Sequence, residues 1–275
     1  MATKIKKCIL YIALILLSVV CVIPFYMMLV NATRSSVDIM SGFTFIPGVS
    51  LADNYETLSK FVNLFQGMWN SIKVAIPATI LTAYFSALTA YALAIYKFKG
   101  RNVIFMTIVI FMMIPGQLSL IGFYNLCSKL KLIDSYIPLI VPAIAAPGTV
   151  FFLRQYVLSV LSPSLLEAAR IDGAGEMHIF HRIVLPIMGP GIATMAIGGF
   201  IGNWNSYLVP MILLNSQEKF TLPVQVASLN AVQDIATNKG AVYLALAISV
   251  IPIMIVFCFC SRWIISSITA GGVKE

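Results

Sequence analysis

Residues 8–30 read CILYIALILLSVVCVIPFYMMLV, a stretch without a single charged side chain. A helix needs about 20 apolar residues to cross a bilayer, so this stretch is long enough. Lys4, Lys6 and Lys7 precede it, which is also the pattern of a cleaved signal peptide. The apolar run is too long for that alternative, and no small-residue cleavage pattern follows it. The stretch therefore predicts an uncleaved membrane anchor.

Five further apolar blocks of similar length follow along the chain. The composition is 60% hydrophobic and 10% charged, whereas soluble domains carry about 25% charged residues. We therefore predict an all-α membrane protein that forms one domain over residues 1–275 and crosses the membrane six times. The predicted spans are residues 8–30, 69–96, 103–126, 135–157, 187–214 and 242–265.

The charged residues favour one orientation of these spans. With a cytoplasmic N-terminus, the cytoplasmic segments carry eleven Lys and Arg against four Asp and Glu, and the external segments carry seven against six. An excess of cations on the cytoplasmic side is the positive-inside pattern. We predict a multi-pass protein of a bacterial-type plasma (inner) membrane with both termini in the cytoplasm. The net charge of +8 then reflects topology and not nucleic-acid binding.

The connections between spans have distinct compositions. The long first external loop, residues 31–68, contains an interrupted apolar stretch at residues 58–65 that predicts a helix on the outer surface. Residues 97–101 form a short basic turn on the cytoplasmic side. Prolines inside membrane helices commonly mark kinks. We expect kinks at Pro115, Pro142, Pro147 and Pro252.

Several function classes lack the residues that they need. No Asp or Glu lies in the interior of a predicted span, although proton- or ion-coupled carriers keep such residues for function. The chain has no Gly-x-x-x-x-Gly-Lys-Ser/Thr loop for ATP, and its five cysteines show neither disulfide nor metal spacing. A membrane enzyme would need a nucleophile, an acid–base pair or a metal set, and the spans contain none. We expect no cofactor on this chain and an energy source on another subunit.

Residues 162–186 read SPSLLEAARIDGAGEMHIFHRIVLP and connect the fourth and fifth predicted spans. Ser162 before Pro163 predicts a helix start, and Gly173 suits the left-handed residue that ends a helix. The following residues place an apolar stripe on a second helix, at Phe180, Ile183, Val184 and Ile187. We interpret the segment as a helical hairpin whose apolar face is buried partly in its own bundle and partly in a partner.

This hairpin resembles the EAA motif of binding-protein-dependent ABC importer permeases. The resemblance rests on Glu167-Ala168-Ala169, Asp172-Gly173-Ala174, Ile183, Leu185-Pro186 and Pro190. In that family the hairpin is a coupling helix, which docks into a cleft of the ATPase subunit and moves when ATP closes the ATPase dimer. The resemblance implies a type I importer fold and ATPase-coupling roles for Glu167, Ala168, Ala169, Asp172, Gly173, Ala174, Phe180, Leu185 and Pro186.

The rest of the chain resembles the MalG-type subunits of maltose-type carbohydrate importers. The similarity rests on the tail at residues 270–274, on Thr221-Leu222-Pro223 and on Asn203-Trp204-Asn205, although Glu275 replaces an expected glycine. It implies a C-terminal ATPase contact through Gly271, Gly272 and Lys274.

The same resemblance implies a non-catalytic subunit that forms half of a sugar or oligosaccharide path. The implied partners are a second homologous permease, two ABC ATPase subunits that bind ATP and Mg²⁺, an extracytoplasmic solute-binding protein, the lipid bilayer and the sugar, with no nucleic acid. A permease for another solute, such as polyamine or phosphate, is the nearest alternative. A proton-coupled secondary carrier is the alternative from a different class.

Three smaller groups of residues leave two interpretations open. Asn203, Trp204, Asn205 and Tyr207 could line the substrate path, because amides and aromatic rings suit a neutral polyhydroxy ligand, or they could bond and pack against neighbouring helices. Glu167 could face a partner or complete a capping box with Ser164, and the motif favours the partner. His178 and His181 lack a fixed third ligand, so ordinary surface positions are favoured over a metal site.

Overall fold

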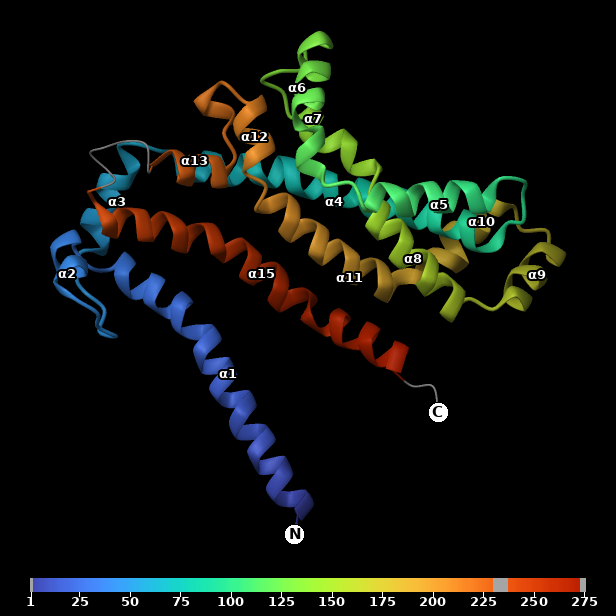
Figure 1. The fold of residues 1–275 in the computed structure, drawn as a ribbon, viewed down its shortest axis with the longest axis horizontal. Helices are drawn as coiled ribbons and strands as arrows, with labels where there is room; N and C mark the ends of the chain where they lie inside the picture. Colours follow the sequence, from blue (N-terminus) through green and yellow to red (C-terminus); the bar gives the residue numbers. More distant parts are fainter. Residues whose placement is uncertain (1, 230–236, 273–275) are drawn as a thin grey trace. The chain divides into compact units, whose positions relative to one another are not determined.

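The computed structural model describes the backbone of residues 2–229 and 237–272 and the side chains of residues 4–229 and 237–259. The elements of the described backbone are all helical, in agreement with the predicted class (Figure 1). The chain divides into two compact units, which are described separately. The first comprises residues 1–68 with 222–252, and the second comprises residues 69–221 with 253–275.

The first unit contains the N-terminal anchor and the first long loop. Its elements are α1 (Ala2–Ala32), α2 (Ser36–Ser41), α3 (Leu51–Ser59), the start of α4 (Leu64–Ile95), α13 (Leu222–Leu229) and the start of α15 (Lys239–Gly272). None of the apolar window of α1 is buried within the protein, as expected of a helix whose surroundings are lipid.

One buried amide fixes the end of α1 in this unit. The Asn54 side chain donates hydrogen bonds to the carbonyl oxygens of Ala32 at 2.9 Å and Arg34 at 3.0 Å. A Cβ atom on Gly240, at the start of α15, would collide with the Arg34 carbonyl oxygen and with the Asn54 amide. The glycine therefore permits the close approach of α15 to α3 and to the residues that follow α1.

The second unit contains the remaining spans and their connections. Its elements are the rest of α4, α5 (Arg101–Met112), η1 (Gly116–Ser119), α6 (Leu120–Lys129), α7 (Ile137–Ile140), η2 (Val141–Ile144), α8 (Pro147–Val160), α9 (Pro163–Ile171), α10 (Glu176–Ile179), η3 (Phe180–Val184), α11 (Leu185–Trp204), α12 (Leu208–Leu213) and η4 (Gln217–Lys219). Small residues on α4, among them Ala87 and Ala90, pack with Leu153 and Val157 of α8 in its buried core.

The described helices match the predicted six spans in number only if one bent pair of helices counts as a single span, and their boundaries differ in detail. The described residues contain five helices long and apolar enough to cross a membrane, and a sixth candidate consists of α5 with η1 and α6. This pair bends by 91° at residues 113–115, where Pro115 precedes η1. The expected kink is therefore a complete break, because proline cannot donate the hydrogen bond that would continue the helix.

The other boundaries differ mainly where an apolar run continues past the end of a helix. The fifth span ends at Trp204 and not at residue 214, and Asn205–Tyr207 separate it from α12. The predicted surface helix at residues 58–65 is wrong. Instead α3 ends at Ser59, its Leu58 is buried, and α4 begins at Leu64.

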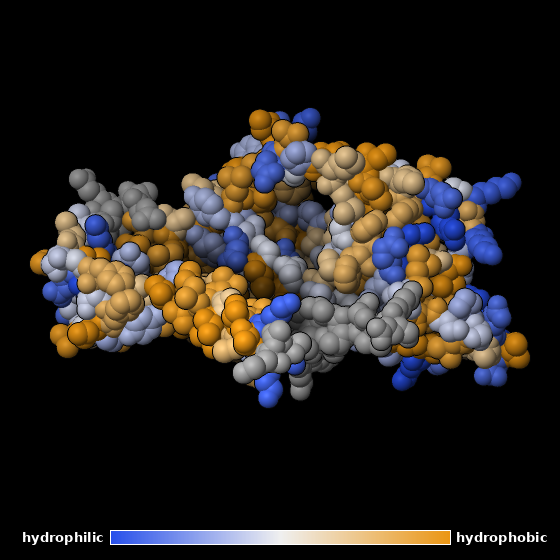
Figure 2. All heavy atoms as spheres, turned by 60° about the horizontal axis from the view of Figure 1, so that its bottom comes forward, coloured by the Kyte–Doolittle hydropathy of each residue, from blue (hydrophilic) through white to orange (hydrophobic). Residues whose placement is uncertain are grey.

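Hydrophobic side chains remain exposed over much of the face drawn in Figure 2. The exposed large apolar residues include long series on α1 and α5. Soluble proteins rarely leave contiguous apolar areas of this kind in water. These surfaces therefore require lipid or partner helices around them.

Candidate functional site: the hairpin between α8 and α11

The first arm of the hairpin starts where the sequence predicts. Ser162 is the N-cap residue of α9 in an extended conformation, and Pro163 occupies the first turn. The Ser162 hydroxyl is paired with the Ser164 hydroxyl at 2.7 Å. Because Ser164 lies inside the helix and not at its cap, the alternative capping box between Ser164 and Glu167 does not form. The Glu167 side chain is exposed instead.

The turn of the hairpin is a Schellman motif. Gly173 adopts φ +81°, its N–H donates to the Arg170 carbonyl at 3.0 Å, and the Ala174 N–H donates to the Ala169 carbonyl at 3.0 Å. These two bonds satisfy carbonyl groups that the end of α9 would leave free. A Cβ atom on Gly173 would meet nothing within 4 Å. The requirement for glycine therefore comes from the backbone angle and not from space.

The second arm is anchored by its apolar stripe. Phe180 and Val184 are buried, Ile183 and Ile187 are partly buried, and the Phe180 ring stacks on Tyr91 of α4 with 5.7 Å between ring centroids. The predicted stripe is confirmed. Residues 180–184 form a π-helical turn, η3, between α10 and α11, which the residue pattern does not predict.

Polar side chains tie the two arms to each other and to α4. Arg170 Nε lies 2.8 Å from Glu176 Oε1, and the hydroxyl of Tyr96, just beyond α4, donates to the other Glu176 oxygen. His181 lies 3.1 Å from the Tyr84 hydroxyl on α4. No group of three His, Cys, Asp or Glu side chains that could hold a metal ion occurs among the described residues.

The residues of the motif divide into an exposed tip and a buried base. Ala169 and Phe180 are buried in the base, four further motif residues are partly buried (Ala174, Ile183, Leu185 and Pro190), and the other motif residues are exposed. Ala169 and Phe180 can therefore act only by holding the hairpin in place. The tip also exposes two apolar side chains outside the motif, Ile171 at 86% and Met177 at 57%.

The predicted substrate-path cluster does not lie within a continuous helix. Asn203 and Trp204 end α11, while Asn205 and Tyr207 belong to the break that follows it. Trp204 is buried and stacks on Phe200 with 5.7 Å between ring centroids, so its role is packing. Asn203 Nδ2 lies 3.4 Å from the Thr79 hydroxyl of α4, while Asn205 and Tyr207 are exposed. The structure thus separates the four residues into packing and exposed positions.

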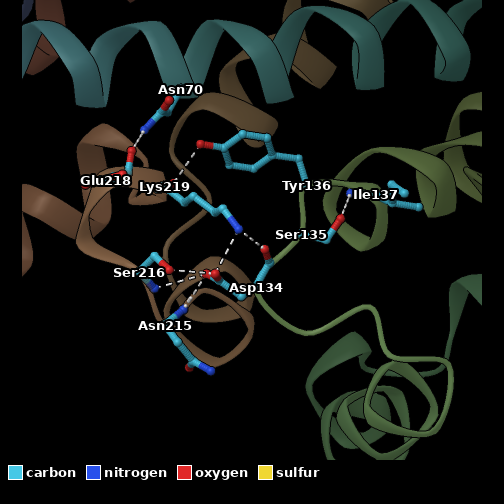
Figure 3. Close-up of polar contacts among 9 residues, drawn as sticks. All are labelled: Asn70, Asp134, Ser135, Tyr136, Ile137, Asn215, Ser216, Glu218 and Lys219. Carbon is cyan, nitrogen blue, oxygen red and sulfur yellow. Dashed lines mark hydrogen bonds and ion pairs between the residues drawn. The ribbon is translucent and has the colours of Figure 1, made fainter.

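A second polar centre, missed from the sequence, joins two loops at the other end of this unit (Figure 3). The Asp134 carboxylate accepts hydrogen bonds from the backbone N–H groups of Asn215 and Ser216, from the Ser216 hydroxyl, and from Lys219 Nζ at 2.8 Å. The hydrogen bond from Lys219, followed by those from Ser216, holds the pKa of Asp134 below its ordinary value. Asn70 of α4 donates to the Glu218 and Phe220 carbonyls in the same loop.

Of the predicted tail residues, Lys274 lies outside the described residues. Gly271 and Gly272 are described by their backbone alone, as the last residues of α15.

A multi-pass helical protein with one broken span and a helical hairpin between two other spans is the architecture of a membrane transport subunit. The chain belongs to the family of binding-protein-dependent transport system inner membrane components, whose model matches residues 80–269. This confirms the family resemblance drawn from the EAA-like motif.

Among its relatives is the arabinooligosaccharides transport system permease protein AraQ of Halalkalibacterium halodurans, 38% identical over 93% of this chain and 92% of the relative. The diacetylchitobiose uptake system permease protein NgcG of Streptomyces coelicolor is 31% identical over 95% of this chain and 87% of the relative. The fold is similar to a chain in the crystal structure of a bacterial ABC transporter involved in the import of alginate. That similarity has a TM-score of 0.81 and 23% identity over 95% of this chain and 97% of the other.

Proposed function

We propose that this chain is the permease subunit of an ATP-driven carbohydrate importer and that it couples to separate ATPase subunits through the α9–α10 hairpin. The observation that carries the proposal is the contrast between the tip and the base of that hairpin. Ile171 at the tip is 86% exposed, while Leu166 and Ala169 of the same helix are buried. An exposed apolar tip on a packed base is what a docking element requires.

The base is built to transmit a displacement of the tip. Leu166, Ile179 and Phe180 share one buried cluster with residues of α4 and α8. Well-packed interiors have low compressibility and pass strain on to their neighbours. A partner that grips the tip would therefore move the base and, with it, the ends of two spans. Burying an isoleucine contributes about 1.5–3 kcal/mol, so Ile171 alone is a substantial anchor.

ATP and Mg²⁺ are assigned to the partner because this chain has no phosphate-binding loop. The proposed assembly contains a second homologous permease, two ATPases and an extracytoplasmic binding protein. Both termini and the hairpin are placed in the cytoplasm, on the basis of the asymmetric distribution of Lys and Arg. The tail residues Gly271, Gly272 and Lys274 are proposed as a second ATPase contact.

Sugar as the substrate is supported by the relatives named for oligosaccharide uptake. The exposed Asn205 and Tyr207 could contact a neutral sugar, because an amide and a phenol both hydrogen-bond hydroxyl groups. Asn203 and Trp204 support that site from α11.

The proposal is tested with the complex purified together with the products of neighbouring genes and reconstituted in liposomes. We expect a sugar with its binding protein to raise ATP hydrolysis and to be taken up. In Ile171→Asp, we expect both to fall while the permease still inserts. Ile46→Asp is the matched control, because Ile46 is 74% exposed in the first long loop. Stimulation by phosphate or polyamine and by no sugar would contradict the substrate, and equal effects of the two variants would contradict the coupling site.

A further inference from the structure

The turn between α4 and α5 carries three cations in five residues, Lys97, Lys99 and Arg101. Residues 97–103 line a hollow of about 470 Å³. Lys97 and Lys99 are exposed, and Phe98 between them is 45% exposed. The turn is therefore a charged surface and not part of the packed interior.

Neither lysine nor the arginine is neutralised by the described part of the chain. The ion pairs found there that involve a Lys or Arg side chain use Lys60, Arg170 and Lys219. Arg101 instead donates a long hydrogen bond, 3.4 Å, to the Tyr96 carbonyl at the end of α4. Three cations around one hollow attract an anion. The attraction is strongest for an anion whose oxygen atoms can accept several charge-assisted hydrogen bonds.

The residues that follow the hollow along α5 indicate that the anion would lie at the membrane surface. Exposed apolar side chains begin two residues after Arg101, with Val103 at 69% and Met106 at 60%. Apolar side chains exposed at the start of a membrane helix are suited to contact with acyl chains. The cations thus lie within about one helical turn of the hydrocarbon boundary, at the depth of lipid headgroups. An exposed aromatic ring such as Phe98 is also suited to that interface.

We propose that residues 97–101 form a binding site for the phosphate headgroup of an anionic phospholipid, on the same membrane side as the hairpin. The lysines and Arg101 contact the phosphate, Phe98 lies at the interface, and the acyl chains pack along the exposed side of α5. A lipid fits better than an acidic protein surface, because the apolar exposed side of α5 continues directly from the charged turn. The side is fixed by Tyr96, which lies between α4 and this turn and donates a hydrogen bond to Glu176 of the hairpin.

The test uses the full chain in detergent micelles, with lipid binding measured by native mass spectrometry. The lipids are phosphatidylglycerol and phosphatidylcholine with the same acyl chains. Each cation near an anionic lipid surface contributes about 1 kcal/mol, roughly fivefold in affinity. Lys97→Gln/Lys99→Gln should therefore weaken phosphatidylglycerol binding by roughly 25-fold and leave phosphatidylcholine binding unchanged. Lys97→Arg/Lys99→Arg, which keeps the charge, should bind as the wild type does.

The chain provides a matched control in Lys129-Leu130-Lys131 at the end of α6, which has the same spacing of two exposed lysines around an exposed apolar residue. Lys129→Gln/Lys131→Gln should retain phosphatidylglycerol binding within about twofold. Equal losses in the two double variants would overturn the proposal, since they would reflect net charge alone. Unchanged phosphatidylglycerol binding in Lys97→Gln/Lys99→Gln would also overturn it, as would displacement of the lipid by an equal concentration of inorganic phosphate. The lipid measurement needs no ATPase, so its failure is separate from failure of the proposed coupling.

Discussion

Replacing Gly173 tests whether the shape of the hairpin turn, and not a side chain, is what coupling requires. Gly173 has φ +81°, and a Cβ atom there would touch nothing within 4 Å. The cost of a substitution is therefore the cost of a left-handed backbone for an L-residue, roughly 1–2 kcal/mol, with β-branched residues at the high end. That range changes the population of the native turn by roughly 5- to 30-fold.

Three variants separate the backbone effect from other causes. Asn tolerates the left-handed region, so Gly173→Asn should stay close to the wild type. Gly173→Ala should lose about 1 kcal/mol, and Gly173→Val should lose more and rearrange the Schellman bonds at Ala169 and Arg170. In the wild type these two hydrogen bonds are each 3.0 Å long, and the variants are compared with that geometry.

The assay is sugar uptake and ATP hydrolysis by the reconstituted complex, with the Tm of the purified permease as a measure of folding. We expect transport to decrease slightly in Gly173→Asn, more in Gly173→Ala and most in Gly173→Val, while Tm falls by only a few degrees for a loss of about 1–2 kcal/mol. Wild-type transport by Gly173→Val at normal expression would refute the reasoning. Equal losses for Asn and Val would show instead that any side chain at this position blocks a contact.

Three further predictions follow from other parts of the structure. Asp134→Asn should lower Tm at neutral pH. The lowered pKa of Asp134 stabilises the fold fully above the ordinary value of about 3.9, and this contribution is lost as the pH falls from there toward the lowered pKa of the folded state, so the gap to wild type should shrink below about pH 3.9; a pH-independent gap would contradict this. Cysteines introduced at Ser164 and Val49 in a cysteine-free background should differ in labelling by an impermeant thiol reagent, with only the Val49 position labelled in intact cells; the reverse pattern would overturn the topology. Asn203→Ala should lower assembly, because its amide lies near Thr79, whereas Asn205→Ala should alter uptake kinetics with assembly intact; identical behaviour of the two would refute the division.

Features set by local chemistry could be predicted from the sequence. The absence of charge over residues 8–30 predicts a spanning helix, because burying a charge in lipid is costly. Gly173 after Asp172 predicts the end of a helix, and the spacing of Phe180 and Val184 predicts one buried stripe. Each of these signals lies within a few residues of the structure that it specifies.

Features that depend on distant partners could not be predicted. Asp134 meets Ser216 and Lys219 across more than 80 positions of sequence, and its short loop gives no sign of them. The end of α11 at Trp204 was missed because the apolar run continues through α12, so hydropathy alone cannot show the break. The π-helical turn likewise leaves no compositional trace.

That π-helical turn, residues 180–184, has a consequence for how the hairpin sequence can change. A π turn contains one residue more than an α turn, and each residue rotates a helix by about 100°. Deleting one residue from it would restore an α-helix and rotate α10, with Met177 and Glu176, by about a quarter turn relative to α11. The extra residue therefore sets the rotation of α10 about the helix axis relative to α11. An insertion or deletion in this turn can consequently change which residues of α10 are exposed, while the residues of α11 that pack in the bundle stay the same.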